Sequence, residues 1–233
     1  MKLPILTLSL LLATTCSTAD SKSVAATARE PHELSNLVNS VYQNTGLATV
    51  GLSQQVFSLA LKGFCKLRDK GLVSADSILT IIDYTKSSKE KRLFVIDLKK
   101  QQLEFNAVVA HGRNSGQEFA RSFSNALSSF KSSLGFFITG NTYKGSNGYS
   151  LKLEGVDKGF NDKASERAIV MHGAPYANES VIRFKGFLGR SLGCPAVPPQ
   201  VHKKIINKIR NGNALFIYYP EQRYLSRSEW LNS

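Results

Sequence analysis

The sequence predicts an α+β fold that is mainly β, with helices near the N-terminus and one helix late in the chain. Apolar residues recur at helical spacing up to residue 73, and the later segments carry the β-branched and aromatic residues typical of strands. The 233 residues are 42% hydrophobic and 20% charged, which is enough apolar material for one sizeable core. Because no repeat of fixed period is present, we expect one compact domain with a small helical appendage.

The first 19 residues have the pattern of a secretory signal peptide. Lys2 is followed by an apolar run over residues 3–13 and by small residues before Asp20, so we expect cleavage after Ala19. A membrane anchor is the alternative, but the run is much shorter than the ~20 residues that a bilayer requires, and no later segment approaches that length. Lipidation of Cys16 is a second alternative, which cleavage after Ala19 would prevent. We therefore expect an exported protein with no integral membrane segment after cleavage.

The chain is strongly basic, with 30 Lys and Arg residues against 17 Asp and Glu residues and a formal net charge of +13. Loss of the signal peptide removes only Lys2 from this total. In an exported protein such a charge favours contact with anionic polymers, lipid headgroups or acidic peptides. No zinc-finger, helix-turn-helix or RNA-recognition pattern accompanies the charge, so no nucleic acid is expected as a partner.

Two helices are expected in the segment 31–73, after a small and polar stretch at residues 20–30 that we expect to be a flexible lead-in. The first helix has five apolar residues on one face and ends at Gly46. The second begins after the capping candidate Ser53 and ends near Gly71.

Strands are expected from residue 74 onward, over residues 78–84, 92–98, 103–110, 135–139, 149–154, 168–172 and 214–219. The polar stretches 87–91 and 99–102 are typical of hairpin connections. One late helix is predicted over residues 201–209, before the last strand. Residues 115–133 show neither period, and residues 221–233 are expected to form a C-terminal tail.

Two local motifs place a reactive side chain next to a glycine. His172-Gly173 ends a predicted strand, and Gly193-Cys194 lies in a loop before the late helix. A thiol is weakly ionised at neutral pH until a base or a positive charge lowers its pKa, and His172 is the candidate base. Gly193 allows a turn in which its own amide and that of Cys194 would hold an oxyanion. The pattern is that of a cysteine nucleophile paired with a histidine base.

Further segments accompany these motifs in a fixed order, namely residues 91–97, 109–116, 132–136 and 190–197. Together they resemble the L,D-transpeptidase catalytic domain of the YkuD type, and within it the murein L,D-transpeptidase branch. That family couples a His-Gly motif to a downstream Ser-x-Gly-Cys motif, which is present here at residues 191–194. The likeness runs from residue 79 to residue 219. It implies a catalytic domain over residues 74–220 with a β-sandwich or mixed-sheet body.

The resemblance implies a transferase that acts on the peptidoglycan of the cell wall. Cys194 would attack the carbonyl of the third residue of a tetrapeptide stem, expel the terminal D-alanine and leave a thioester, while His172 accepts the thiol proton. The acyl group would pass to an amine of a second stem, or to water in an L,D-carboxypeptidase outcome. Gly193 would hold the oxyanion, Ser191 would brace the loop or contact the histidine or substrate, and Gly173 would lie beside the substrate. Such an enzyme would be periplasmic or associated with the cell wall.

The chain departs from the family pattern beside the cysteine. Many members read Ser-His-Gly-Cys followed two places later by Arg, where this chain has Leu192 and Ala196. Arg190 either replaces that Arg as a contact for a stem carboxylate, which a guanidinium binds in a bidentate manner, or is a solvated surface residue.

Two other classes of function remain open. In a non-catalytic wall-binding module, Cys65 and Cys194 would form a structural disulfide. A zinc-dependent wall hydrolase would take its ligands from His111, His172, Cys194 and His202. No pair among these has a compact spacing such as His-x-x-x-His, so we expect no metal and no other cofactor. His111 is expected to be structural, and His32 and His202 are expected at ordinary surface positions.

Overall fold

The computed structural model describes residues 21–74 and 77–232, with side chains from residue 33 onward. The predicted signal peptide and the side chain of His32 therefore lie outside the described residues. The chain divides into two compact units, one ending at Asn36 and the other running from Leu37. Within the part of the chain that is described, no helix combines the length and apolar character needed to cross a bilayer.

Eight strands form one mixed sheet within the described residues, in the order β3-β2-β1-β8-β4-β5-β6-β7. The strands are β1 (Ile78–Asp83), β2 (Leu93–Asp97), β3 (Gln102–Ala107), β4 (Gly135–Gly145), β5 (Gly148–Gly155), β6 (Val170–Gly173), β7 (Ala196–Val197) and β8 (Ala214–Tyr218). The β1/β8 and β6/β7 pairs are parallel, and the other neighbours are antiparallel. The predicted α+β class with a mixed-sheet body is confirmed.

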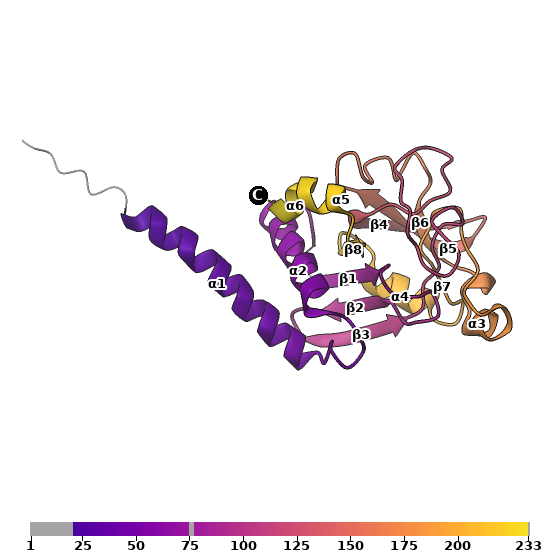
Figure 1. The fold of residues 1–233 in the computed structure, drawn as a ribbon, viewed down its shortest axis with the longest axis horizontal. Helices are drawn as coiled ribbons and strands as arrows, with labels where there is room; N and C mark the ends of the chain where they lie inside the picture. The colour runs from indigo at the N-terminus through magenta and orange to yellow at the C-terminus, as the bar shows by residue number, and fades with distance from the viewer. Residues whose placement is uncertain (1–20, 75–76, 233) are drawn as a thin grey trace, which may run out of the picture. The chain divides into compact units, whose positions relative to one another are not determined.

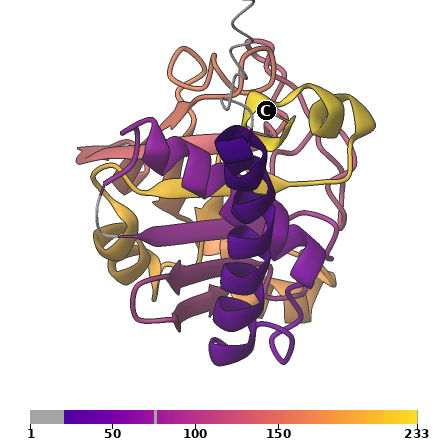
Figure 2. The same ribbon diagram turned by 90° about the vertical axis from the view of Figure 1, so that its left-hand side faces the viewer.

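The centre of the sheet is buried on both faces. Figure 1 shows β8 between the hairpin-linked strands β1 to β3 and the group β4 to β7, and Figure 2 shows the yellow strand β8 above β1, with β2 and β3 below it. Every residue of β1, β2 and β8 is buried. A strand covered on both faces reads as a continuous apolar run, which explains why these strands stand out in the sequence.

Two helices that the sequence predicts pack against this sheet. Helix α2 (Gln54–Asp69) begins where expected, because the Ser53 hydroxyl accepts a hydrogen bond from the Val56 amide at 3.2 Å. It packs against β1 and β8. Helix α4 (His202–Ile209) buries its isoleucines and packs against β1, β5 and β6. Helix α4 therefore supports the strand that carries His172.

Helix α1 (Ser21–Asn44) begins ten residues before the expected position. Residues 21–30, expected to be a flexible lead-in, are helical in the structure. Three of them, Ala25, Ala26 and Ala28, belong to the residue type with the highest intrinsic helix propensity. Alanine-rich helices show apolar periodicity only weakly, so the periodicity of the sequence does not reveal where α1 begins.

The C-terminal segment, expected to be a tail, folds into helices α5 (Gln222–Arg227) and α6 (Glu229–Asn232). Tyr224, Trp230 and Leu231 are buried, and α6 packs against α2 as Figure 1 shows. Helices this short are unstable in isolation, so contacts with the rest of the fold stabilise them. The η1 turn (Pro175–Ala177) and helix α3 (Glu179–Lys185), which lie between β6 and β7, were also not predicted.

Candidate active site

The loop that carries Cys194 is a tight turn closed from within by Ser191. The Ser191 hydroxyl accepts a hydrogen bond from the Gly193 amide at 3.0 Å and donates one to the Cys194 carbonyl at 2.6 Å. Gly193 has a φ of +125°, and a Cβ there would lie 2.9 Å from the Lys131 carbonyl oxygen. Only glycine therefore fits this position of the loop.

The two amides expected to hold an oxyanion differ in their partners. The Gly193 amide already donates to Ser191. The Cys194 amide has no acceptor among the residues that the structure describes. The Cys194 amide is therefore free to donate to an oxyanion that forms beside the thiol.

The Cys194 thiol is nearly enclosed, since only 9% of the residue is exposed. Its Sγ accepts from the Val170 amide at 3.5 Å and lies 3.7 Å from the Ala168 carbonyl oxygen. Burial raises the pKa of the Cys194 thiol, while the Val170 amide and the positive charge of Arg167 lower it. The Val170 amide and the Arg167 charge therefore both favour the thiolate, which is the nucleophilic form of a thiol.

His172 lies on β6 between Ser150 of β5 and Ala196 of β7. Its Nδ1 is 3.1 Å from the Gly173 carbonyl oxygen. A carbonyl only accepts, so Nδ1 carries the proton and Nε2 keeps the lone pair. Burial lowers the pKa of His172, which keeps the ring neutral and able to act as a base.

The structure brings the Cys194 loop, which leads into β7, beside β6, the strand that carries His172. Val170, whose amide reaches Sγ, and His172 lie two residues apart and share one face of β6. No hydrogen bond joins the Cys194 and His172 side chains among the described contacts. Catalytic hydrogen bonds are often long before substrate binds, so the pair remains a candidate dyad.

Two further residues, Tyr176 and Arg167, interact electrostatically with Cys194. The sequence alone does not identify either of them as part of the site. The Tyr176 ring lies edge-on to the His172 ring, with centroids 6.5 Å apart. Burial and the negative charge of Cys194 raise the pKa of Tyr176 to about 12, so its phenol keeps its proton. The only sequence signals are an aromatic residue four places after the histidine and an arginine five places before it.

His111 is a structural residue in this fold. Arg92 is fully buried and donates to His111 Nδ1 at 2.8 Å, and His111 Nε2 lies 3.2 Å from the Gly116 carbonyl oxygen. Burial and the Arg92 charge lower the pKa of His111 to about 3, so this ring stays neutral with both nitrogens engaged. The His111 carbonyl accepts from the Ser191 amide at 2.9 Å, which fastens the Cys194 loop to this segment.

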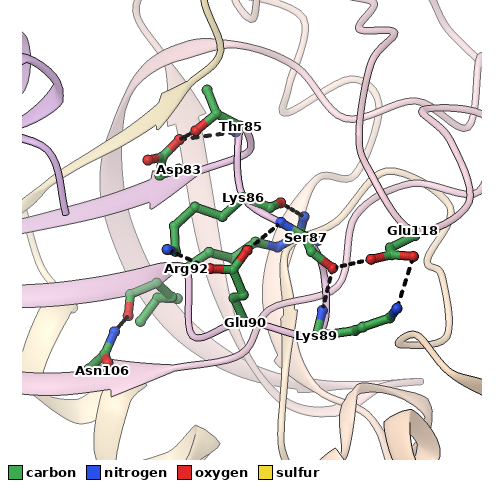
Figure 3. Close-up of polar contacts among 10 residues, drawn as sticks. Asp83, Thr85, Lys86, Ser87, Lys89, Glu90, Arg92, Asn106 and Glu118 are labelled. Atoms are coloured by element: carbon green, nitrogen blue, oxygen red, sulfur yellow. Dashed lines mark hydrogen bonds and ion pairs between the residues drawn. The ribbon is translucent and has the colours of Figure 1, made fainter. Parts of the chain in front are cut away.

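Charged side chains hold the β1–β2 connection around Arg92, which donates to the Lys86 carbonyl (Figure 3). Lys86 pairs with Glu90 at 2.8 Å, and Glu118 accepts from the Ser87 hydroxyl at 2.6 Å and pairs with Lys89 at 3.1 Å. Because Glu118 belongs to the loop that follows His111, this network ties the hairpin to the segment beside the Cys194 loop.

Arg190 and Gly173 are the remaining residues that the sequence predicts to contact substrate. Arg190 is exposed, and its Nη1 is 3.4 Å from the carbonyl oxygens of Arg113 and Gly116. Gly173 leaves room for His202, because a Cβ at Gly173 would lie 2.6 Å from the His202 ring. The expectation that His202 is an ordinary surface residue is wrong, since it is half-buried against β6. Gly173 and His202 line a cavity of about 680 Å³.

The structure also shows the residues on which the wall-binding module and the zinc hydrolase would depend. Cys65 and Cys194 are both free thiols, so the disulfide of the binding-module alternative is not formed. Across residues 21–74 and 77–232, no three His, Cys, Asp or Glu side chains gather as a metal-ligand group.

A family model for the L,D-transpeptidase catalytic domain matches residues 48–218 of the chain. The match covers well over half of the sequence, and the chain belongs to the L,D-transpeptidase catalytic domain family. No protein with a curated description matches the chain.

Several solved structures are similar to the chain. An L,D-transpeptidase from Mycobacterium smegmatis has 10% sequence identity over 61% of this chain and 59% of its own, with a TM-score of 0.40. An L,D-transpeptidase from Stackebrandtia nassauensis has 12% identity over 70% of this chain and 66% of its own, with a TM-score of 0.38. The chain thus spans about three fifths of the length of the first of these proteins.

Proposed function

We propose that this protein is an exported peptidoglycan L,D-transpeptidase that works through a thioester on Cys194. The observation that carries the proposal is that the Cys194 Sγ accepts from the amide of Val170, which lies two residues before His172 on β6, within the family's domain. The enclosed thiol, the neutral histidine and the free Cys194 amide supply a nucleophile, a base and an oxyanion donor.

In the first half-reaction, Nε2 of His172 accepts the thiol proton as Sγ of Cys194 attacks the carbonyl carbon of the third stem residue. The C–S bond forms and the oxyanion is held by the Cys194 amide. On collapse the C–N bond to the terminal D-alanine breaks, and His172 returns the proton to the leaving amine.

In the second half-reaction, an amine of another stem attacks the thioester. His172 takes a proton from that amine, the C–N bond of the crosslink forms and the Cys194 thiolate leaves. Water in place of the amine gives a carboxypeptidase product by the same steps. We assign to Arg190, which is exposed at the start of the loop, a contact with a stem carboxylate.

Mass analysis of products formed from purified disaccharide tetrapeptides tests the proposal. We expect crosslinked dimers that have lost one D-alanine, or tripeptides if water is the acceptor. Cys65→Ser should retain this activity because Cys65 is a free thiol on α2, away from the loop of residues 191–195. Unchanged substrate after long incubation, or activity that EDTA removes and zinc restores, would replace the proposal with one of its rivals.

A further inference from the structure

Arg167 lies in the turn before β6 and makes an unusual set of contacts. Its Nη1 donates to the Ser124 carbonyl at 2.7 Å and to the Ser133 hydroxyl. Its Nη2 donates to the Lys131 carbonyl at 2.6 Å and to the Ser129 hydroxyl at 3.2 Å. All four acceptors are neutral, and no ion pair of the described residues includes Arg167. Its positive charge is therefore not neutralised by a carboxylate.

The Arg167 guanidinium is packed against the Cys194 loop. Its Nη2 lies 3.4 Å from the position that a Cβ on Gly193 would occupy. The segment it binds also reaches that loop, because the Ser132 hydroxyl donates to the Gly193 carbonyl at 3.2 Å. The next residue along the chain, Ala168, supplies the carbonyl oxygen that lies 3.7 Å from Sγ. The Arg167 side chain thus adjoins the Cys194 loop at Gly193, and the residue that follows Arg167 contacts the thiol itself.

His172 and the two tyrosines near the thiol carry no positive charge. Burial lowers the pKa of His172 and raises those of Tyr84 and Tyr176, so all three are neutral near pH 7. Among the described cations near the loop, Lys131 donates its ammonium to the Ser122 hydroxyl, Arg113 lies over the Phe130 ring and Arg190 is exposed. The Arg167 charge lowers the pKa of the Cys194 thiol, and the Cys194 charge raises that of Arg167.

We propose that Arg167 is a positioning residue of the active site, which fastens the serine-rich segment 124–133 under Gly193 and stabilises the Cys194 thiolate with its charge. This inference rests on the proposed function, since it assigns a role toward the proposed nucleophile. A guanidinium suits both tasks, because its planar fork binds several acceptors at once and stays charged when partly buried.

The test is the pH dependence of Cys194 alkylation by iodoacetamide, followed by mass analysis of the peptide that contains Cys194. The alkylation measurement does not require turnover of peptidoglycan. It therefore tests the role of Arg167 separately from the proposed function. Arg167→Gln should raise the alkylation midpoint by about one pH unit, which corresponds to roughly tenfold slower alkylation near neutral pH.

Two further variants separate charge from folding. Arg167→Lys keeps the charge but not the fork, so its midpoint should stay within about half a unit of wild type while transpeptidation slows. Arg210→Gln removes an exposed charge at the end of α4 and should leave the midpoint unchanged. A folded Arg167→Gln protein with the wild-type midpoint would overturn the inference. If that variant does not fold, a midpoint raised by a full unit in Arg167→Lys would overturn it instead.

Discussion

At the scale of single residues, the His172 ring is oriented by the backbone of its own strand. Its Nδ1 is engaged by the Gly173 carbonyl at 3.1 Å, which leaves Nε2 as the basic nitrogen. No carboxylate is needed for this orientation, because the acceptor is the carbonyl of the following residue. The orientation of the His172 ring is therefore fixed as long as β6 holds its register between β5 and β7.

His172→Ala should slow acylation of Cys194 by a carbapenem by ~10² to 10⁴, the usual contribution of general-base assistance. The adduct should still form and map to Cys194, because the attachment site is intact. Intact-mass measurements over time give both rates. Equal rates for wild type and variant would remove His172 from the role of base.

Gly193 and Gly159 offer a matched pair of substitutions. Both have a positive φ, but a Cβ at Gly193 meets the Lys131 carbonyl oxygen, whereas a Cβ at Gly159 meets nothing within 4 Å. Gly193→Ala should distort the loop and lower turnover by about 100-fold, the effect of misplacing a reacting group by about 1 Å. Gly159→Ala should cost only about 1 kcal/mol of stability and leave turnover unchanged. Comparable turnover in the two folded variants would contradict the role given to Gly193.

The candidate site could be predicted from the sequence where its residues are contiguous. Two short motifs contain His172, Ser191, Gly193 and Cys194, and their residue types indicate the chemistry without a structure. Arg167 and Tyr176 have no such motif. Their proximity to Cys194 arises from the pairing of β6 with β7 and from the folding of the serine-rich segment, which are tertiary events.

At the scale of elements, the sequence predicts long apolar strands well and short elements poorly. The central strands β1, β2 and β8 are continuous apolar runs because both faces are buried. β7 has two residues, which is too few for any periodicity. The terminal helices α5 and α6 depend on the buried side chains of Tyr224 and Trp230, so only the folded context reveals them.

A buried carboxylate anchors these terminal helices. Asp157 accepts from the Ser228 hydroxyl at 2.5 Å, from the Tyr224 hydroxyl at 3.3 Å and from the Phe136 amide at 2.6 Å. Burial raises the pKa of Asp157 to about 6, despite these donors. The folded state therefore binds a proton more tightly than the unfolded chain, whose Asp has an ordinary pKa near ~4.

This difference predicts a pH-dependent stability. The contribution of protonated Asp157 is fully present below pH ~4 and is lost as pH rises toward 6, a change of roughly 3 kcal/mol for about two pKa units. Asp157→Asn cannot titrate, so the stability of wild type relative to this variant should fall between pH 4 and pH 6.5. Denaturant unfolding at a series of pH values measures it. A constant difference, or one that grows with pH, would contradict the raised pKa.

At the scale of the whole molecule, the basic charge and the enclosure of Cys194 both bear on the proposed reaction. The chain has a formal net charge of +13, and exposed Arg190 lies beside the enclosed Cys194. A basic surface raises the local concentration of acidic peptides and anionic polymers, while a nearly enclosed thiol is protected from reaction with solutes that are not held in place. The family domain covers residues 48–218, so the described site lies wholly within it.

Catalysis through a thioester on Cys194 predicts an intermediate that can be trapped on the protein. Wild-type protein mixed with a disaccharide tetrapeptide and quenched in acid should show, by intact mass, an adduct of the substrate minus D-alanine that maps to the Cys194 peptide. Cys194→Ala should fold, show no adduct and form no product. Product formed by folded Cys194→Ala, or an adduct that maps to Cys65 in place of Cys194, would contradict catalysis through this thioester.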